Sequence, residues 1–165
     1  MLPGTPAGTL APRVAGAAEF RATLAWRSLK DVPAGPTLVV PPGPTRCSLA
    51  ETDDPEAATR RLAGEIRALT QADLGAVLEE VLRTLTKVAA LTEATLEVEV
   101  VRSVPPRAAS PQALRSLARD LRKVGLSVRF EPAWTPLPDA DAYLGVGGRN
   151  GLHDFLRAHP AWSLA

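Results

Sequence analysis

The sequence has a single cysteine, only three lysines and few aromatic residues, which make up 4% of its 165 residues. The one cysteine, Cys47, excludes an intrachain disulfide and any zinc site built on cysteines. No apolar run reaches the roughly 18–20 residues that span a bilayer, and the first residues lack the charged and apolar regions of a secretory signal. A free thiol without an export signal predicts a cytoplasmic protein with no membrane partner.

An excess of one charge is also missing. Nineteen basic residues stand against 18 acidic ones, for a formal net charge of +1, which excludes a globally basic protein that coats DNA. The length fits one ordinary domain, and the shares of hydrophobic (45%) and charged (22%) residues are those of a globular chain. We expect a flexible arm rich in Pro, Gly and Ala over residues 1–16, followed by a single domain over residues 17–165.

Alternation of apolar and polar residues is typical of strands with one buried side. It predicts five strands, over residues 19–26, 37–40, 95–101, 126–130 and 142–146. The first two, separated by a turn with Pro33, Gly35 and Pro36, are expected to form a hairpin.

Helix signals are strongest in the middle of the chain. Asp54-Pro55 resembles a helix start, and an apolar stripe at steps of three and four residues runs from Leu74 to Val88. Thr70 with Asp73 resembles a capping box, so residues 55–91 form either one long helix or two. A further helix is expected between Ser110-Pro111 and Gly125, and a short one over residues 152–158.

These elements predict an α/β fold, with α+β as the alternative. The expected architecture is a small mixed sheet of four to five strands packed against two or three helices. The strand at 95–101, the helix after Ser110 and the strand at 126–130 are expected to form a parallel crossover.

One glycine-rich segment, residues 145–151, follows a predicted strand. Backbone N–H groups at Gly147 and Gly148, together with Arg149, suit an anion at a helix N-terminus. The spacing matches neither a dinucleotide-binding nor a Walker motif. The alternative is a tight turn, because Asn150-Gly151 is a favoured hairpin pair.

A basic set is the second candidate site. Residues 102–130 contain seven basic side chains and a single acid, Asp120. Arginine suits phosphate oxygens, so this set predicts contact with nucleic acid or another acidic partner, with a solvated helix face as the alternative. The seven are Arg102, Arg107, Arg115, Arg119, Arg122, Lys123 and Arg129.

No catalytic residue, metal site or cofactor is predicted. Cys47 and Ser48 lack a neighbouring base, and the only histidines, His153 and His159, are six residues apart and so lie on different faces of a helix. Four acidic residues crowd the expected helix start, where capping explains them; they are Glu51, Asp53, Asp54 and Glu56.

The sequence therefore favours a non-enzymatic binding or assembly module, with the chain itself as a partner in a homo-oligomer. The alternative is a protein that binds nucleic acid or a phosphate ligand through the basic set and the glycine-rich turn. An enzyme is the weaker hypothesis, because so few nucleophiles, bases or metal ligands are available.

Overall fold

The computed structural model describes residues 7–38, 44–137, 140 and 143–145. The chain divides into two compact units: a sheet unit, Ala15–Pro106, and a terminal unit, Met1–Val14 with Arg107–Ala165. Where we expected an arm and one continuous domain, residues Thr9–Leu10 and Arg13–Val14 are short strands with buried Leu10 and Val14 side chains. The two units arise because the ends of the chain pair with each other, whereas the middle closes its own sheet.

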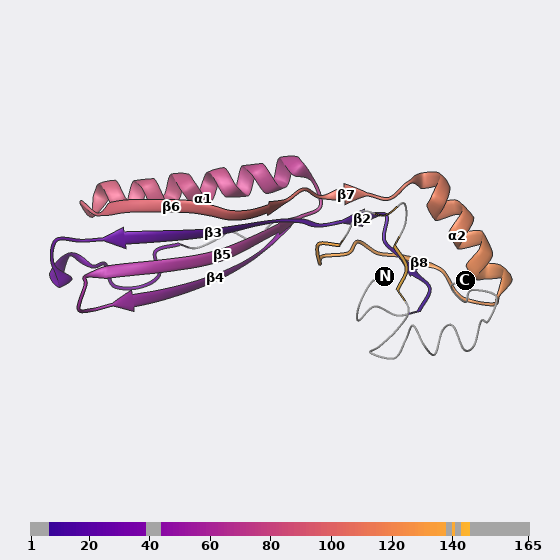
Figure 1. The fold of residues 1–165 in the computed structure, drawn as a ribbon, viewed down its shortest axis with the longest axis horizontal. Coiled ribbons are helices and arrows are strands. Elements are labelled where there is room, and N and C mark those ends of the chain that lie inside the picture. Colours follow the sequence, from indigo (N-terminus) through magenta and orange to yellow (C-terminus); the bar gives the residue numbers. More distant parts are fainter. Residues whose placement is uncertain (1–6, 39–43, 138–139, 141–142, 146–165) are drawn as a thin grey trace. The chain divides into compact units, whose positions relative to one another are not determined.

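The sheet unit contains four ten-residue strands and one long helix (Figure 1). The strands are β3 (Gly16–Ala25), β4 (Thr45–Asp54), β5 (Thr59–Ala68) and β6 (Thr95–Val104), in the order β4-β5-β3-β6 with every neighbouring pair antiparallel. The helix α1 (Gln71–Leu91) connects β5 to β6. This is the strand order of a split βαββαβ unit. Between β3 and β4, the described residues form only a short 3-10 helix, η1 (Leu29–Asp31).

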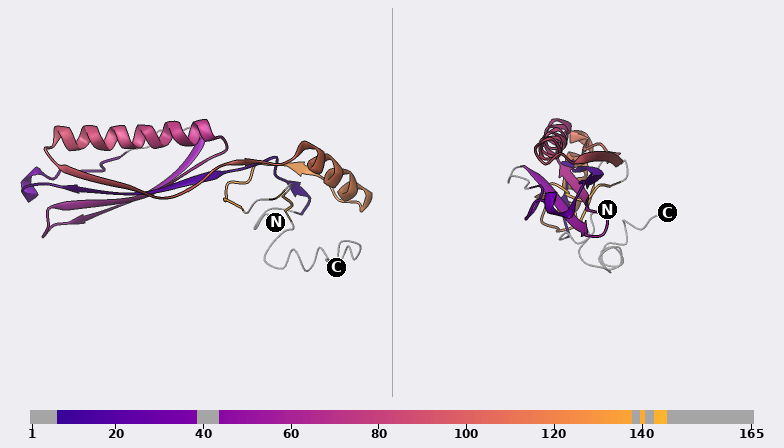
Figure 2. Two further views of the ribbon diagram at one scale, coloured as in Figure 1. Left: turned by 45° about the horizontal axis from the view of Figure 1, so that its top comes forward. Right: turned by 90° about the vertical axis from the view of Figure 1, so that its left-hand side faces the viewer.

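One face of this sheet is buried under α1 (Figures 1 and 2). Alternate residues of β3, from Ala18 to Leu24, join Leu62 and Ile66 of β5 in a core with the helix residues Leu74, Val81 and Leu85. Strands alternate their side chains between faces, so the residues between these lie on the opposite face. No described helix covers that opposite face, which we call the open face.

The prediction of a helix from residue 55 is wrong, because residues 59–68 form β5. Leu62 and Ile66 do share a face, but the face belongs to a strand whose alternation is hidden by Arg60 and Gly64. Asp54 does not cap a helix; its carboxylate accepts hydrogen bonds from the backbone N–H groups of Glu56 and Ala57 in the β4–β5 turn. The expected hairpin between strands 19–26 and 37–40 is also wrong, since β3 pairs with β5 and β6.

The second half of that stretch follows the prediction. Thr70 caps α1, its hydroxyl accepting a hydrogen bond from the backbone N–H of Asp73. Residues 55–91 therefore contain a strand and one helix, so neither the single-helix nor the two-helix reading is right. The stripe from Leu74 to Val88 packs on the sheet, with Leu74, Val81 and Leu85 buried.

The terminal unit holds short strand pairs and one helix. β1 (Thr9–Leu10) pairs in parallel with β8 (Arg129–Phe130), and β2 (Arg13–Val14) pairs antiparallel with β7 (Arg107–Ala108). Between β7 and β8 lies α2 (Pro111–Lys123), capped by Ser110 and followed by Gly125 at φ +80° as predicted. The predicted parallel crossover is wrong, because β8 pairs with β1 and β6 with β3.

The predicted α/β fold class is confirmed: the described residues form a four-stranded antiparallel sheet, short strand pairs and two α-helices. The expected strand at 142–146 is described only in part, where Leu144 bridges to Leu10. The helix expected over 152–158 lies outside the described residues. None of the helices in the described part of the chain has the length and apolar character to cross a membrane.

Candidate functional site

The open face of the sheet carries polar side chains in rows that run across the strands. One row is Ser48, Glu65, Glu19 and Arg102, and the next is Ala50, Ala63, Arg21 and Glu99. Residues directly opposite in an antiparallel pair have their side chains close together on the same face. The register therefore places two small alanines beside three carboxylates and two arginines.

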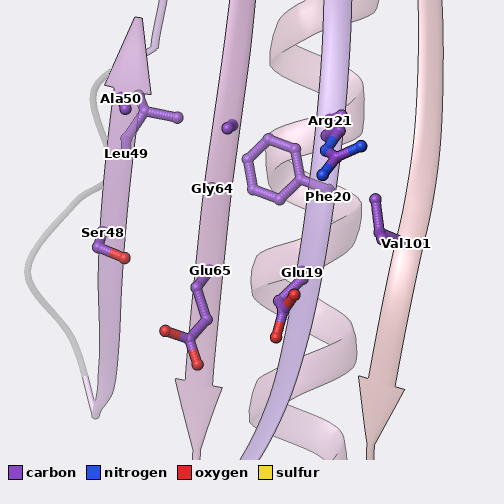
Figure 3. A pocket seen from close by; sticks show the side chains of 10 residues that line it. Glu19, Phe20, Arg21, Ser48, Leu49, Ala50, Gly64, Glu65 and Val101 are labelled. Atoms are coloured by element: carbon purple, nitrogen blue, oxygen red, sulfur yellow. The ribbon is translucent and has the colours of Figure 1, made fainter.

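The small side chains leave a hollow of about 370 Å³ on this face (Figure 3). Ala50 and Ala63, which are cross-strand partners, form its floor together with the backbone of Gly64. Ser48, Glu19, Glu65 and Arg21 line it as well. The hollow thus has an apolar floor with acidic groups and one guanidinium at its edges.

The two carboxylates of the hollow are each matched by an arginine. Arg67 donates to both oxygens of Glu65, with Nε–Oε1 and Nη2–Oε2 distances of 2.8 Å, and this bond raises the pKa of Arg67. Arg102 Nη1 lies 3.5 Å from Glu19 Oε1. Within the part of the chain that the structure describes, Arg21 forms no ion pair. Arg21 is therefore the cation best placed to receive an anionic group.

A second polar network lies on the side of the sheet that α1 covers. Arg60 is 4% exposed and donates to both carboxylate oxygens of Asp53, with Nε–Oδ1 and Nη2–Oδ2 distances of 2.5 and 3.0 Å. It also donates to the carbonyl oxygens of Pro33 and Gly35 and to the Thr37 hydroxyl. This one side chain therefore fixes the segment 33–37 against β4 and β5.

Glu51 completes this network from the same strand as Asp53. Its carboxylate accepts the backbone N–H groups of Thr37 and Leu38 at 3.1–3.2 Å and lies 3.8 Å from Arg60. The hydrogen bond from Arg60 lowers the pKa of Asp53, and the same bond raises the pKa of Arg60. The reading of these acids as helix-capping residues is wrong, because Glu51 and Asp53 hold a loop through an arginine.

The structure separates the predicted basic set. Arg102 lies on β6 in the sheet unit, whereas the other six belong to the terminal unit, on β7, α2 and β8. On α2, Arg119 and Lys123 lie 3.5 and 3.7 Å from Asp120, so part of the basic set is a solvent-exposed cluster of ion pairs. Anion binding by these residues stays a prediction.

The remaining sequence candidates contribute less. Cys47 is a free, half-buried thiol on β4, and burial raises its pKa, which disfavours a reactive thiolate. Gly147, Gly148, Arg149 and both histidines lie outside the described residues. No group of three His, Cys, Asp or Glu side chains that could hold a metal ion occurs among the described residues.

Sequence reasoning missed the hollow. Its residues come from β3, β4 and β5, and two of these strands were not predicted where they lie. The only available signal was the alternation over residues 19–26, which leaves Glu19, Arg21 and Thr23 on one face of the predicted strand. A site assembled across strands requires the register, and a single sequence does not supply it.

Comparison with known proteins shows that this fold is similar to those of several solved structures. No protein-family model and no curated protein sequence matches the chain, but many solved structures do. A tripeptidase from Staphylococcus aureus is similar at a TM-score of 0.66 and 15% identity, over 87% of this chain and 47% of that protein. An amidase of the hydantoinase/carbamoylase family from Burkholderia multivorans is similar at a TM-score of 0.61 and 12% identity, over 76% of this chain and 37% of that protein.

Aminopeptidase PepT from Bacillus cereus is also similar, at a TM-score of 0.59 and 13% identity, over 81% of this chain and 42% of that protein. The chain spans less than half the length of each of these three enzymes. The expectation of a non-enzymatic binding or assembly module is wrong, and so is its nucleic-acid alternative, because the similar structures are amidases and peptidases. The scarcity of nucleophiles and bases misled the prediction, since such groups need not cluster in the part of an enzyme that this chain matches.

Proposed function

We propose that this chain is a substrate-binding part of a hydrolase that cleaves amide bonds, of the amidase or peptidase type. The fold that it shares with a tripeptidase, an aminopeptidase and an amidase is the observation that carries this proposal. A cytoplasmic setting belongs to the proposal, because the thiol of Cys47 is free.

The reaction adds the oxygen of water to an amide carbonyl carbon, breaks the C–N bond and releases the amine with a proton. Such a reaction gains from groups that hold the substrate's charged ends, because fixed orientation lowers the entropic part of the barrier. Peptides and their hydrolysis products carry an ammonium and a carboxylate. A site for them needs both signs of charge within a few ångströms.

The hollow on the open face meets this requirement. Arg21 offers a guanidinium for a carboxylate, while Glu19 and Glu65, which are cross-strand partners, offer carboxylates for an ammonium group. Arg67 and Arg102 form ion pairs with these two glutamates. The floor of Ala50 and Ala63 leaves room for the small side chains of a short peptide.

Calorimetric titration of the full chain with tri-alanine tests the proposal. We expect measurable binding that falls at least about tenfold in Arg21→Gln, which loses the carboxylate partner, and in Ala63→Phe, which fills the hollow. Arg83→Gln is the matched control, because Arg83 is exposed on α1 and pairs only with Glu80 among the described residues. Equal affinity in all four proteins, or no binding by the wild type, would overturn the proposal.

A further inference from the structure

The strand β6 forms an edge of the sheet with no described strand beyond it. Eight of its ten residues are exposed, among them Val98 (37%), Val100 (44%) and Val101 (42%). An edge strand presents unpaired backbone N–H and C=O groups along its outer side. Such an edge can add a further strand from another polypeptide.

The two faces of this edge differ in chemistry. Val98 and Val100 pair with Ala22 and Phe20, whose side chains belong to the core beneath α1. Glu97 and Glu99 lie on either side of Val98 and so point to the open face. A strand that extends the sheet here meets apolar side chains on one face and two carboxylates on the other.

Pairing with a second copy of the same edge is disfavoured. A two-fold axis centred on Val98 sets Glu97 of each copy opposite Glu99 of the other, and axes centred on Glu97 or Glu99 set that glutamate opposite itself. Like charges in directly opposed positions destabilise a sheet. If two copies paired through residues after Val100, they would pair at the position where the β3–β6 register shifts. A bulge at that position hinders regular pairing.

From these observations we infer that the β6 edge binds an extended segment of a different polypeptide, in which lysine or arginine alternates with valine or isoleucine. Its basic side chains lie opposite Glu97 and Glu99, and its apolar side chains continue the face of Val98 and Val100. The regular part of the edge before the irregularity is Thr95–Val100, which is long enough to pair with every residue of a segment of five. This inference is independent of the proposed hydrolase function.

Peptide binding to the full chain tests this inference. The probe is the peptide Val-Lys-Val-Lys-Val, acetylated and amidated at its ends, and Val-Glu-Val-Glu-Val is its partner of opposite charge. We expect the lysine peptide to bind at least about tenfold more tightly, with new protection of β6 amides from hydrogen exchange. A lysine peptide methylated on every backbone nitrogen keeps its charge but has no backbone N–H to donate to the ladder, and it should not bind.

Charge reversal provides the matched variants. Glu97→Lys with Glu99→Lys should invert the preference between the two peptides, whereas Glu79→Lys, an exposed position on α1, should leave it unchanged. Binding of the methylated peptide, equal binding of the two charged peptides, or no binding of either would overturn the inference. So would a dimer of the wild type, seen in sedimentation, that dissociates on Val98→Lys.

Discussion

The guanidinium of Arg60 and the carboxylate of Asp53 face each other in a two-pronged pair, with Nε–Oδ1 at 2.5 Å and Nη2–Oδ2 at 3.0 Å. The arginine side chain is 5% exposed and the aspartate 54% exposed. The pair thus has a buried cation and a solvated anion, so loss of the arginine and loss of the aspartate should have different consequences.

Replacing Arg60 with methionine should destabilise the chain by about 3 kcal/mol. The carbonyl oxygens of Pro33 and Gly35 lose their donor, and the half-buried Glu51 loses the cation that lies 3.8 Å away. Denaturant unfolding followed by circular dichroism measures this. Arg61→Met is the control: Arg61 is exposed and 3.9 Å from Asp54, so its loss should change stability by less than about 0.5 kcal/mol. Equal effects at the two positions would refute the role of Arg60.

The Asp53–Arg60 pair should also make the free energy of unfolding depend on pH in the acidic range. The pKa of Asp53 is lowered in the folded state, so its contribution is present above the unfolded pKa of about 3.9. That contribution is lost as the pH falls through the folded pKa. Asp53→Asn should therefore flatten the loss of stability below about pH 4. Thermal unfolding from pH 2 to pH 7 measures it, and parallel curves for the two proteins would contradict the prediction.

A tight contact between Gly64 and Phe20 should make position 64 intolerant of alanine. A Cβ atom there would lie 2.5 Å from the Phe20 ring atoms Cε1 and Cζ, and overpacking of this kind costs about 1–3 kcal/mol. Gly75→Ala is the control, because a Cβ there meets nothing within 4 Å, and in a helix it should stabilise by up to about 1 kcal/mol. Chemical denaturation measures both, and a neutral Gly64→Ala would show that the ring moves aside freely.

The start of α1 at Thr70 predicts a measurable cap. Thr70→Ala removes the hydroxyl that accepts the Asp73 N–H at 3.1 Å, and loss of such a cap costs about 1 kcal/mol. Thr86→Ala is the comparison, since Thr86 is exposed in the middle of α1, where its hydroxyl donates to the Leu82 carbonyl. That bond gives little stability in a helix. If both replacements have the same effect, the helix does not begin at Thr70.

The regularity of the apolar pattern within each element explains which parts of this fold could be predicted. β3, β6, α1 beyond Thr70 and α2 carry regular periods and clear caps, so their positions follow from local chemistry. β5 does not, because Arg60 and Gly64 occupy buried-face positions that apolar residues normally fill. Arg60 is buried there only because Asp53, Glu51 and the loop carbonyls surround it, and these partners are distant in sequence.

The candidate site could not be predicted for the same reason, because its contacts also join residues that are distant in sequence. Glu65 becomes a neighbour of Glu19 and Arg21 only through the β3–β5 register. Ala50 becomes part of the floor through the β4–β5 register. Once β5 is taken for a helix, none of these contacts can be foreseen. The sequence also did not indicate the similarity to amidase and peptidase structures, because the described polar groups form ion pairs and not a motif.

The central claim is that the hollow on the open face recognises the charged ends of a short peptide. The most direct measurement is a nuclear magnetic resonance titration of the full chain with tri-alanine and with tri-alanine acetylated and amidated at its ends. We predict that free tri-alanine shifts the amide signals of residues around the hollow, from Glu19 to Arg21 and from Ala63 to Glu65, and that the capped peptide does so at least about tenfold more weakly. Equal shifts with both peptides, or shifts that leave these residues untouched, would contradict the account.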